Sequence, residues 1–427
     1  MQGSDKRFYL SGIDYFQLLI DHHNKKNGGL GHEARLAIFL RGFLPEKTLR
    51  EHLAANAHCR QLAQVRIDKK WGLGYPSIVF TKKPTEIPVT SHTLDSDTLP
   101  DAFLNIPVPA YTAPPLHVQL LYLPNGHTCV LFSFHHILFD YSGVESFIAS
   151  LGGAGQSIPL LPAPEPKRPF FVRFKAFFRA VAFTFKEANY KMTVPEKPLP
   201  VAPLQWTTYR ELSFSTRETQ QFLENCRKNG SAFSPSTFQL ACVSKALHDQ
   251  MFSRQRRHRF IWAPVPVNVR RKGVPGAILS NGLSFLFYKL KPADLGTVDQ
   301  ALKSIQYQMK EQMRKGLPQA FVDFADGYWY MPLPIYYPMF NLPSWGRLSS
   351  FSFSTLGNSF PNLTEFMGLP VLDVVNYPSN SIAPGLTILF YEFRGQLRLM
   401  SSWVKGWYTA EEESSLLARI KALMLGE

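Results

Sequence analysis

The sequence contains few cysteines for its length. Cys59, Cys129, Cys226 and Cys242 are the only four among 427 residues, and no Cys-x-x-Cys or Cys/His spacing occurs. Disulfide-stapled domains and structural zinc sites both need closely associated cysteines. We therefore expect four free thiols in a reducing compartment, and no metal site.

Long hydrophobic runs are absent as well. No window reaches the roughly 18 consecutive apolar residues of a membrane-spanning helix, and the N-terminal stretch lacks the apolar core and cleavage pattern of a secretory signal. These absences predict a cytoplasmic protein. Peripheral contact with the inner membrane surface stays compatible with them.

Acidic side chains are in deficit. Asp and Glu number 32 against 46 Lys and Arg, which gives a formal net charge of +14. A surplus of positive charge attracts nucleic acids, anionic membranes, phosphates and acidic proteins. Because no recognised nucleic-acid-binding motif accompanies the charge, nucleic acid is not expected as a partner.

Length and composition predict a folded protein of more than one lobe. A chain of 427 residues is too long for one compact core, and its 45% of hydrophobic residues are sufficient to build a large one. Stretches rich in Gly and Pro at 152–169 and 192–204 are typical of linkers. We predict an N-terminal lobe over residues 1–165, a linker over 166–204 and a C-terminal lobe over 205–427.

The strongest functional signal lies in residues 130–143. An apolar run rich in Val, Leu and Phe predicts a buried strand, and it leads into His135, His136, Asp140 and Gly143. Successive strand side chains point to opposite faces, so only one of the two histidines can line a given cavity. An imidazole exchanges protons near neutral pH and can act as a general base. The alternative is an ordinary strand end, with one histidine in the core and Asp140 capping the next helix.

The linker region predicts a basic amphipathic helix over residues 167–186. Lys175, Arg179 and Lys186 fall on one side of it, and an apolar stripe falls on the other. The stripe consists of Phe170, Phe171, Phe174, Phe177, Phe178, Val181 and Phe185. Two hypotheses stay open: the stripe packs into a lobe or lines a substrate tunnel, or the helix lies on a membrane surface.

The histidine motif resembles that of a known superfamily. Residues 135–140, His-His-Ile-Leu-Phe-Asp, are similar to the HHxxxD signature of chloramphenicol-acetyltransferase-like acyltransferases. This superfamily includes the condensation domains of peptide synthetases and the wax ester synthase/diacylglycerol acyltransferases. Glycine usually follows the aspartate directly, whereas Tyr141 and Ser142 precede Gly143 here. Weaker similarities follow in the family's order at 10–16, 114–126, 264–270, 279–284 and 353–358.

The resemblance implies an α/β (α+β) fold of two lobes, each a mixed sheet flanked by helices, with the active-site tunnel between them. It implies acyl transfer from a thioester, with acyl-CoA or a phosphopantetheinyl carrier protein as co-substrate and no bound cofactor. His136 would deprotonate the acceptor and then protonate the departing thiolate. Asp140 would hold the loop through an ion pair with Arg270, and His135 would stay outside the chemistry.

Several further residues are candidates for binding the reacting groups. Backbone amides near Gly143 and the hydroxyls of Ser354 and Thr355 are candidate donors to the oxyanion, and Asn281 is a further structural candidate. Basic clusters suit the phosphates of CoA or an acidic carrier protein, although a solvated surface is the alternative. The candidates in these clusters are Arg254, Arg256, Arg257 and Arg271.

The acceptor is the least specified part of the prediction. Wax ester synthases carry Asn-Asp where this chain has Ser236-Thr237, and they favour Trp at the place of His117. Both positions are closer to condensation-type sequences, whereas the Phe-rich helix favours a long-chain substrate near a membrane. We favour an O-acyltransferase acting on a lipid-like alcohol. The alternatives are a stand-alone condensation-type enzyme that forms an amide or ester from carrier-bound substrates, and a non-catalytic module that docks a carrier.

Overall fold

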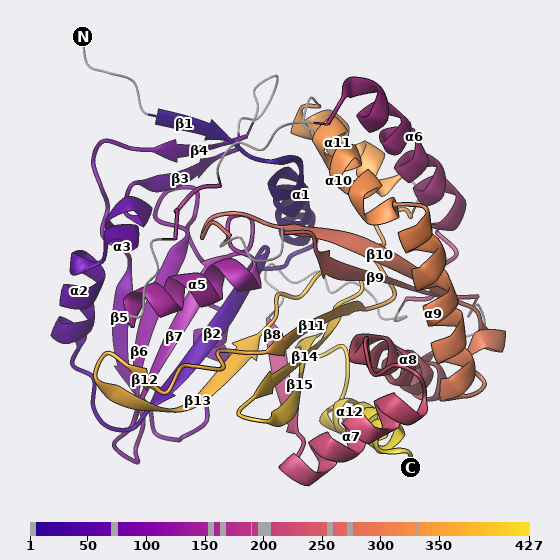
Figure 1. The fold of residues 1–427 in the computed structure, drawn as a ribbon. Coiled ribbons are helices and arrows are strands. Elements are labelled where there is room, and N and C mark those ends of the chain that lie inside the picture. Colours follow the sequence, from indigo (N-terminus) through magenta and orange to yellow (C-terminus); the bar gives the residue numbers. More distant parts are fainter. Residues whose placement is uncertain are drawn as a thin grey trace.

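Two lobes lie side by side in the computed structural model of the chain (Figure 1). It describes residues 6–69, 76–152, 158–162, 168–188, 190–194, 206–253, 259–270, 276–328, 331–342 and 344–427. Helices and strands are interspersed along the chain and the two larger sheets are mixed, so the predicted α/β fold is confirmed. Within the described residues, no helix combines the length and hydropathy needed to cross a membrane.

A six-stranded sheet forms the centre of the first lobe. Its strands are antiparallel except for the parallel pair β5–β6. In spatial order they are β12 (Glu365–Phe366), β13 (Leu369–Tyr377), β2 (Glu33–Leu40), β7 (Thr128–His135), β6 (Leu116–Tyr122) and β5 (Val89–Thr93). Every residue of β7 is buried, as expected for a central strand that is covered on both faces.

A small antiparallel sheet and five helices surround this centre. The small sheet has the order β1 (Lys6–Tyr9), β4 (Ser77–Phe80), β3 (Val65–Asp68). The helices are α1 (Gly12–Lys26), α2 (Glu46–Ala55), α3 (Ala57–Leu62), α4 (Asp101–Leu104) and α5 (Tyr141–Leu151). Helix α1 begins with a capping box formed by Ser11 and Asp14, and α5 begins with Asp140 as its N-cap.

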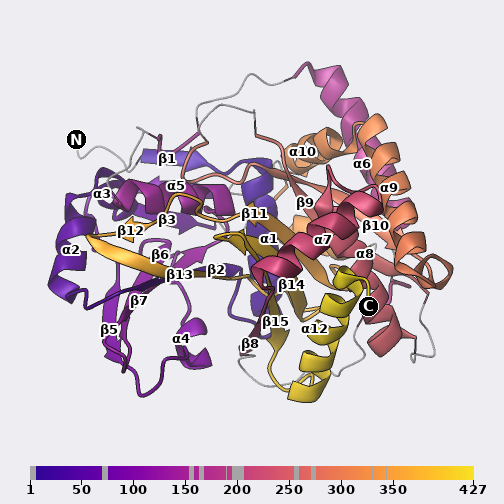
Figure 2. The same ribbon diagram turned by 60° about the horizontal axis from the view of Figure 1, so that its bottom comes forward.

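The second lobe is built on a four-stranded sheet and a two-stranded ribbon. The sheet has the order β11 (Ser352–Asn358), β14 (Leu386–Phe393), β15 (Gln396–Val404), β8 (Thr207–Ser213), and the ribbon pairs β9 (Ile261–Asn268) with β10 (Leu283–Leu290). Figure 2 shows α7, α8 and α12 gathered beside this sheet. The helical segments are α6 (Phe170–Glu187), α7 (Thr216–Lys228), α8 (Pro235–Leu247), η1 (His248–Phe252), η2 (Pro292–Leu295), α9 (Val298–Arg314), α10 (Leu317–Tyr328), α11 (Leu333–Asn341) and α12 (Ala410–Leu425).

The two lobes have separate hydrophobic cores, but the chain crosses between them. One core surrounds β2, β6, β7 and α5, and the other surrounds α8, β14, β15 and α12. Strands β12 and β13 belong to the C-terminal part of the sequence, yet β13 pairs with β2 in the sheet of the first lobe. Residues 205–427 therefore do not lie in one lobe alone. Whether the segments 1–165 and 205–427 fold as independent units is still a prediction.

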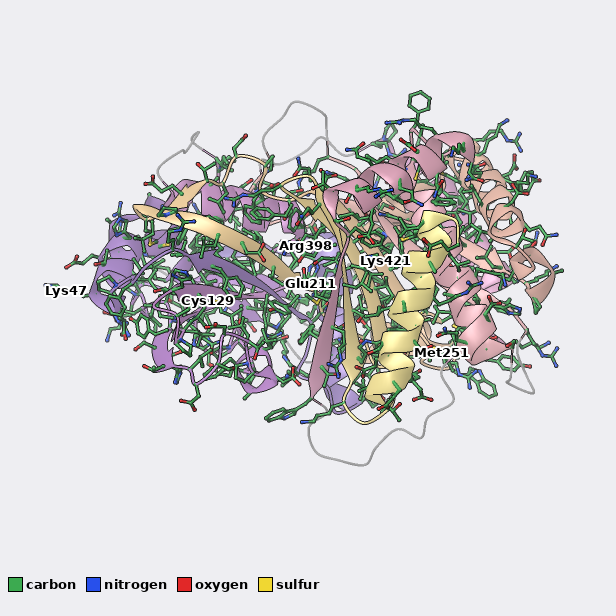
Figure 3. All side chains as sticks on the ribbon, turned by 90° about the horizontal axis from the view of Figure 1, so that it is seen from below. Lys47, Cys129, Glu211, Met251, Arg398 and Lys421 are labelled. Atoms are coloured by element: carbon green, nitrogen blue, oxygen red, sulfur yellow. The ribbon has the colours of Figure 1, made fainter. Side chains whose placement is uncertain are left out.

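A polar contact joins the two larger sheets. Arg398 of β15 pairs with Asp373 of β13 at 2.8 Å and with Glu211 of β8 at 3.2 Å. Figure 3 shows Arg398 and Glu211 at the boundary between the lobes. A guanidinium shared by two carboxylates at this position fixes the angle between neighbouring sheets more specifically than apolar packing does.

The start of α5 is packed so closely that only glycine fits at position 143. A Cβ added to Gly143 would lie 2.3 Å from the carbonyl oxygen of Ile278, in a segment from the C-terminal half of the chain. At the other end of the helix, a Cβ added to Gly152 would meet nothing closer than 3.7 Å. Close packing, and not backbone conformation, therefore explains the glycine at position 143.

We expect Gly143→Ala to lower the free energy of unfolding by about 1–3 kcal/mol, because the added methyl group displaces the Ile278 segment. Gly152→Ala is the matched control at the opposite end of the same helix and should stay within about 0.5 kcal/mol of the parent. Chemical denaturation of both variants measures the difference. Equal stabilities would contradict the close approach of the Ile278 segment to α5.

Candidate active site

A cavity of about 510 Å³ lies between the lobes, and His136 forms part of its wall. His136 follows β7 directly, and its backbone N–H donates to the carbonyl oxygen of His32 at 2.8 Å. The same wall contains Ser354 and Thr355 of β11. The cavity therefore brings the histidine motif of the first lobe together with a strand of the second.

Burial sets the protonation state of His136. Removal from water lowers the pKa of its imidazole below the ordinary value of 6.5. Its ring stacks on that of His32, with centroids 4.6 Å apart and planes 8° from parallel. Burial and the neighbouring His136 also lower the pKa of His32, well below the ordinary value. Both rings are therefore neutral at pH 7, and a neutral imidazole can accept a proton.

Sequence analysis missed His32 and its partner Gln17. The His32 ring nitrogen Nε2 lies 2.8 Å from Gln17 Oε1, and both residues line the cavity. Gln17 comes from α1, so this helix orients the ring on which His136 stacks. A histidine just before β2 carries no recognisable motif, and only the stacking geometry reveals its position.

His135 lies outside the cavity, in a buried charged network. Its Nε2 is 3.4 Å from Asp21 Oδ1, and Asp21 also pairs with Lys25 at 2.9 Å and accepts a hydrogen bond from Tyr111. Burial alone would raise the pKa of Asp21, but its interactions with His135 and Lys25 hold that pKa well below its usual range. The two adjacent histidines thus occupy opposite sides of the strand end, one in a charged cluster and one in the cavity wall.

The Asp140 carboxylate has three partners. Its Oδ1 accepts the Gly143 N–H at 3.0 Å and caps α5, while its Oδ2 accepts the Gly282 N–H at 2.9 Å. Arg270 Nη1 lies 2.5 Å from Oδ2, and both side chains are largely buried. The helix cap and the ion pair with Arg270, which the sequence suggested as separate roles, are therefore made by one carboxylate.

Asn281 holds the backbone of the motif. Its Nδ2 donates to the carbonyl oxygen of Ile137 at 2.7 Å and to that of His136 at 3.2 Å. The same amide group and the Asn281 backbone N–H both donate to Asp14 Oδ1, at 2.9 and 3.1 Å. Asn281 does not line the cavity, so its contacts are those of a positioning residue and not of an oxyanion donor.

The predicted oxyanion donors divide into two groups. The Gly143 amide is already bonded to Asp140, so it does not face a substrate. Ser354 and Thr355 both line the cavity and stay candidates, but they are neighbours in β11, so only one of the two hydroxyls can face a given bound group. The predicted phosphate-binding residues Arg254, Arg256, Arg257 and Arg271 lie outside the described residues.

The two residues inserted before Gly143 form part of the cavity wall. Tyr141 and Ser142 occupy the first turn of α5, and the Tyr141 hydroxyl contacts the Ser359 hydroxyl just after β11. Burial raises the pKa of Tyr141, so this side chain is a neutral hydrogen-bonding group. The insertion thus adds an aromatic side chain that connects α5 to the second lobe.

The remainder of the cavity is largely apolar and rich in aromatic side chains. Most of the aromatic side chains belong to the second lobe, and α1 adds Phe16. From α1 and the second lobe the set comprises Phe16, Trp262, Phe285, Phe287, Phe321, Phe324, Tyr336, Phe340 and Phe353, and the first lobe adds Phe134, Phe139, Tyr141 and Tyr377. The cations in the wall are engaged by protein groups: Arg35 pairs with Glu33 at 2.9 Å, and Arg347 donates to the Tyr190 carbonyl oxygen at 2.8 Å. Such a lining suits an apolar ligand.

No protein-family model matches the chain, and no curated protein matches it. Solved structures match over nearly the full length. The first condensation domain of the CDA synthetase is 15% identical, with a TM-score of 0.68 and coverage of 99% of this chain and 96% of that chain. A trichothecene 15-O-acetyltransferase from Fusarium sporotrichioides is 13% identical, with a TM-score of 0.69 and coverage of 99% and 97%.

A third match is polyketide synthase associated protein 5 from Mycobacterium tuberculosis, at 18% identity, with a TM-score of 0.63 and coverage of 92% of this chain and 93% of that chain. At these identities the similarity establishes a shared fold. The two-lobed fold implied by the sequence resemblance is confirmed.

The Asp140–Arg270 pair allows a quantitative test. Removal of one partner leaves the other charge buried without a counterion, so Asp140→Asn and Arg270→Met should each lower the free energy of unfolding by about 3–5 kcal/mol. In the double variant the loss should be smaller than the sum, by about 0.5–3 kcal/mol. Urea denaturation of the four proteins measures this coupling.

The exposed pair Lys47–Glu51, with its two atoms 3.9 Å apart, serves as the control. Glu51→Gln should change the stability by less than about 0.5 kcal/mol. Additive effects of Asp140→Asn and Arg270→Met would contradict a direct interaction between these side chains.

Proposed function

We propose that the protein is an acyltransferase that moves an acyl group from a thioester to the hydroxyl of an apolar, lipid-like acceptor. The observation that carries this proposal is His136, a partly buried imidazole with a lowered pKa in the wall of a cavity shared by both lobes. The fold, which is also that of condensation domains and an O-acetyltransferase, supports the same reaction class.

His136 is the general base in this mechanism. It takes the proton from the acceptor hydroxyl while the oxygen attacks the thioester carbonyl carbon. The negative charge moves to the carbonyl oxygen, for which the hydroxyl of Ser354 or Thr355 in the cavity wall is the candidate donor. The C–S bond then breaks, and the imidazolium returns its proton to the departing thiolate. The products are an ester and a free thiol, without a covalent acyl-enzyme.

The donor is proposed to be acyl-CoA or an acyl carrier protein, used as a co-substrate. The aromatic lining of the cavity favours a long-chain acyl group or an apolar acceptor over a sugar or a nucleotide. The net charge of +14 favours a donor with phosphates or an acidic carrier.

A condensation-type reaction is the second candidate. The CDA synthetase condensation domain shares the fold over 99% of this chain, and the same base could deprotonate an amine. The product would then be an amide formed from carrier-bound substrates. A docking module without catalysis is the third reading, and it makes no use of the His136 geometry.

An assay of the purified protein tests these candidates. The donors are labelled acyl-CoA of graded chain length and acyl carrier protein, and the acceptors are mixed alcohols and amines. We expect ester formation with long-chain donors and apolar alcohols, and a loss of at least about 100-fold in His136→Ala, the contribution typical of a general base. The control is His52→Ala, which removes an exposed histidine of α2 and should leave the rate unchanged. Amide products would favour the condensation reaction, and turnover by His136→Ala near the parent rate would contradict the mechanism.

The acid limb of the pH profile provides an independent test. A general base must be deprotonated, and burial lowers the pKa of His136, so kcat/KM should decline only below pH 6.5. The measurement is kcat/KM of the parent between pH 4.5 and 8, with the melting temperature followed over the same range as a control for unfolding. An acid limb centred above 6.5 would contradict a buried neutral base.

A further inference from the structure

We propose that the outer face of α6 docks the protein on an anionic membrane surface. This face carries the aromatic ridge, which we define as Phe170, Phe171, Phe174, Phe178 and Phe185. The five side chains are 50 to 76% exposed. The inference goes beyond the proposed acyl transfer and does not depend on it.

The buried side of α6 already has its partner. Ala176 and Ala180 pack against α10, and the Phe177 ring lies 5.4 Å from that of Phe324. The small alanine side chains allow the two helices to approach closely, which leaves the ridge on the outward side. Burial of the stripe in a lobe is therefore wrong for most of its members, because the alanine face of the helix occupies that position.

The rings of Phe170, Phe171, Phe174 and Phe178 form one continuous aromatic surface, and Phe185 lies about two turns farther along α6. The rings of Phe170 and Phe174 have centroids 5.8 Å apart, and those of Phe174 and Phe178 are 4.7 Å apart. Scattered exposed apolar residues are ordinary on a soluble protein, but a contiguous apolar patch marks an interaction surface. Figure 1 shows α6 at the outer edge of the second lobe, where a flat surface can reach it.

The charge beside the ridge has one sign. Lys175 and Lys186 are exposed and make no ion pair within the described residues, and Arg179 donates to the Lys315 carbonyl oxygen. The one acidic residue of the helix, Glu187, pairs with Lys289 at 3.2 Å. Aromatic side chains flanked by unneutralised cations match the interface of an anionic bilayer.

Acidic groups on α10 do not cancel this charge. Arg168 pairs with Asp323, and Arg173 lies 3.4 Å from Asp326. The carboxylates nearest to α6 thus face its N-terminal arginines, and the lysines remain available to lipid headgroups.

The ridge lies next to the cavity. Thr184 and Ala188, at the C-terminal end of α6, line the cavity, as do Phe321 and Phe324 of α10 beneath it. A molecule leaving a bilayer at the ridge is therefore about one helix diameter, roughly 10 Å, from the cavity wall. A membrane partner thus suits the apolar lining of the cavity better than a soluble partner does.

Two other occupants fit less well. A second copy of the chain would bring the same lysines face to face, which opposes self-association through this helix. An acidic carrier protein would complement the lysines, but it would leave a continuous row of phenylalanines against a polar surface. The interface of an anionic bilayer can accept the phenylalanines of the ridge and the lysines beside it at the same time.

Flotation of the full-length protein with phosphatidylcholine vesicles, with and without phosphatidylglycerol, tests the proposal. We expect flotation with the anionic vesicles, little with phosphatidylcholine alone, and weaker binding at high salt. Phe174→Ser/Phe178→Ser should reduce the partition coefficient at least tenfold. Lys175→Glu/Lys186→Glu should reduce it on anionic vesicles in particular.

The matched controls make the same kinds of substitution outside α6. Phe43→Ser/Phe233→Ser replaces two exposed phenylalanines far from α6 in the sequence, and Lys47→Glu/Lys303→Glu makes the same change in net charge. Both controls should float like the parent. All four variants alter exposed side chains, so their melting temperatures should agree with the parent's and exclude misfolding as a cause.

Three results would overturn the proposal. The first is a parent that fails to float with anionic vesicles, and the second is a control that loses binding as much as the α6 variant does. The third is a size-exclusion dimer or a carrier-protein complex that Phe174→Ser/Phe178→Ser abolishes. Flotation requires no substrate, so its failure would leave the acyl-transfer assay unaffected, and the converse also holds.

Discussion

The carboxylate of Asp140 is the constraint on which the site depends. It caps α5, accepts the Gly282 amide and pairs with Arg270, so a single buried group fixes the motif loop to the second lobe. A buried carboxylate is costly unless every lone pair is used. Here the cost is offset by partners from both lobes, and the carboxylate therefore ties the orientation of the histidine loop to the position of the opposite cavity wall.

The end of β7 separates two electrostatic environments within one dipeptide. On one side, His135 belongs to a charged cluster with Asp21 and Lys25. On the other side, His136 stacks on His32, and burial keeps both rings neutral. The strand ends between the two residues: His135 is the last residue of β7, and His136 begins the turn that follows it. The charge of Asp140 raises the pKa of His136, but desolvation outweighs it and the pKa stays below its ordinary value.

The sequence predicted the local features and, through the family resemblance, one distant contact, but it missed the other distant pairings. The apolar run before His135 is a buried strand, and the predicted contact between Asp140 and Arg270 is present. The pairing of β13 with β2 and the stacking of His32 on His136 join residues far apart in the chain, and no periodicity encodes them. Helical spacing predicted the α6 helix but not its orientation. Ala176 and Ala180, and not the phenylalanines, form the side of the helix that packs against α10.

Each lobe contributes different residues to the cavity, so the proposed reaction requires a rigid contact between the lobes. In the proposed reaction the first lobe supplies the base, whereas the second supplies most of the aromatic side chains of the cavity wall and the candidate hydroxyls of β11. A proton is transferred over hydrogen-bond distances, so a shift of about 1 Å between the lobes would separate the base from the acceptor it serves. Three polar contacts oppose such a shift: Asp140 with Arg270, Arg398 with Asp373, and Asn281 with the backbone of Ile137. All three contacts use directional hydrogen bonds. They therefore hold the two lobes at a fixed distance from each other, whereas apolar packing would only hold the lobes together.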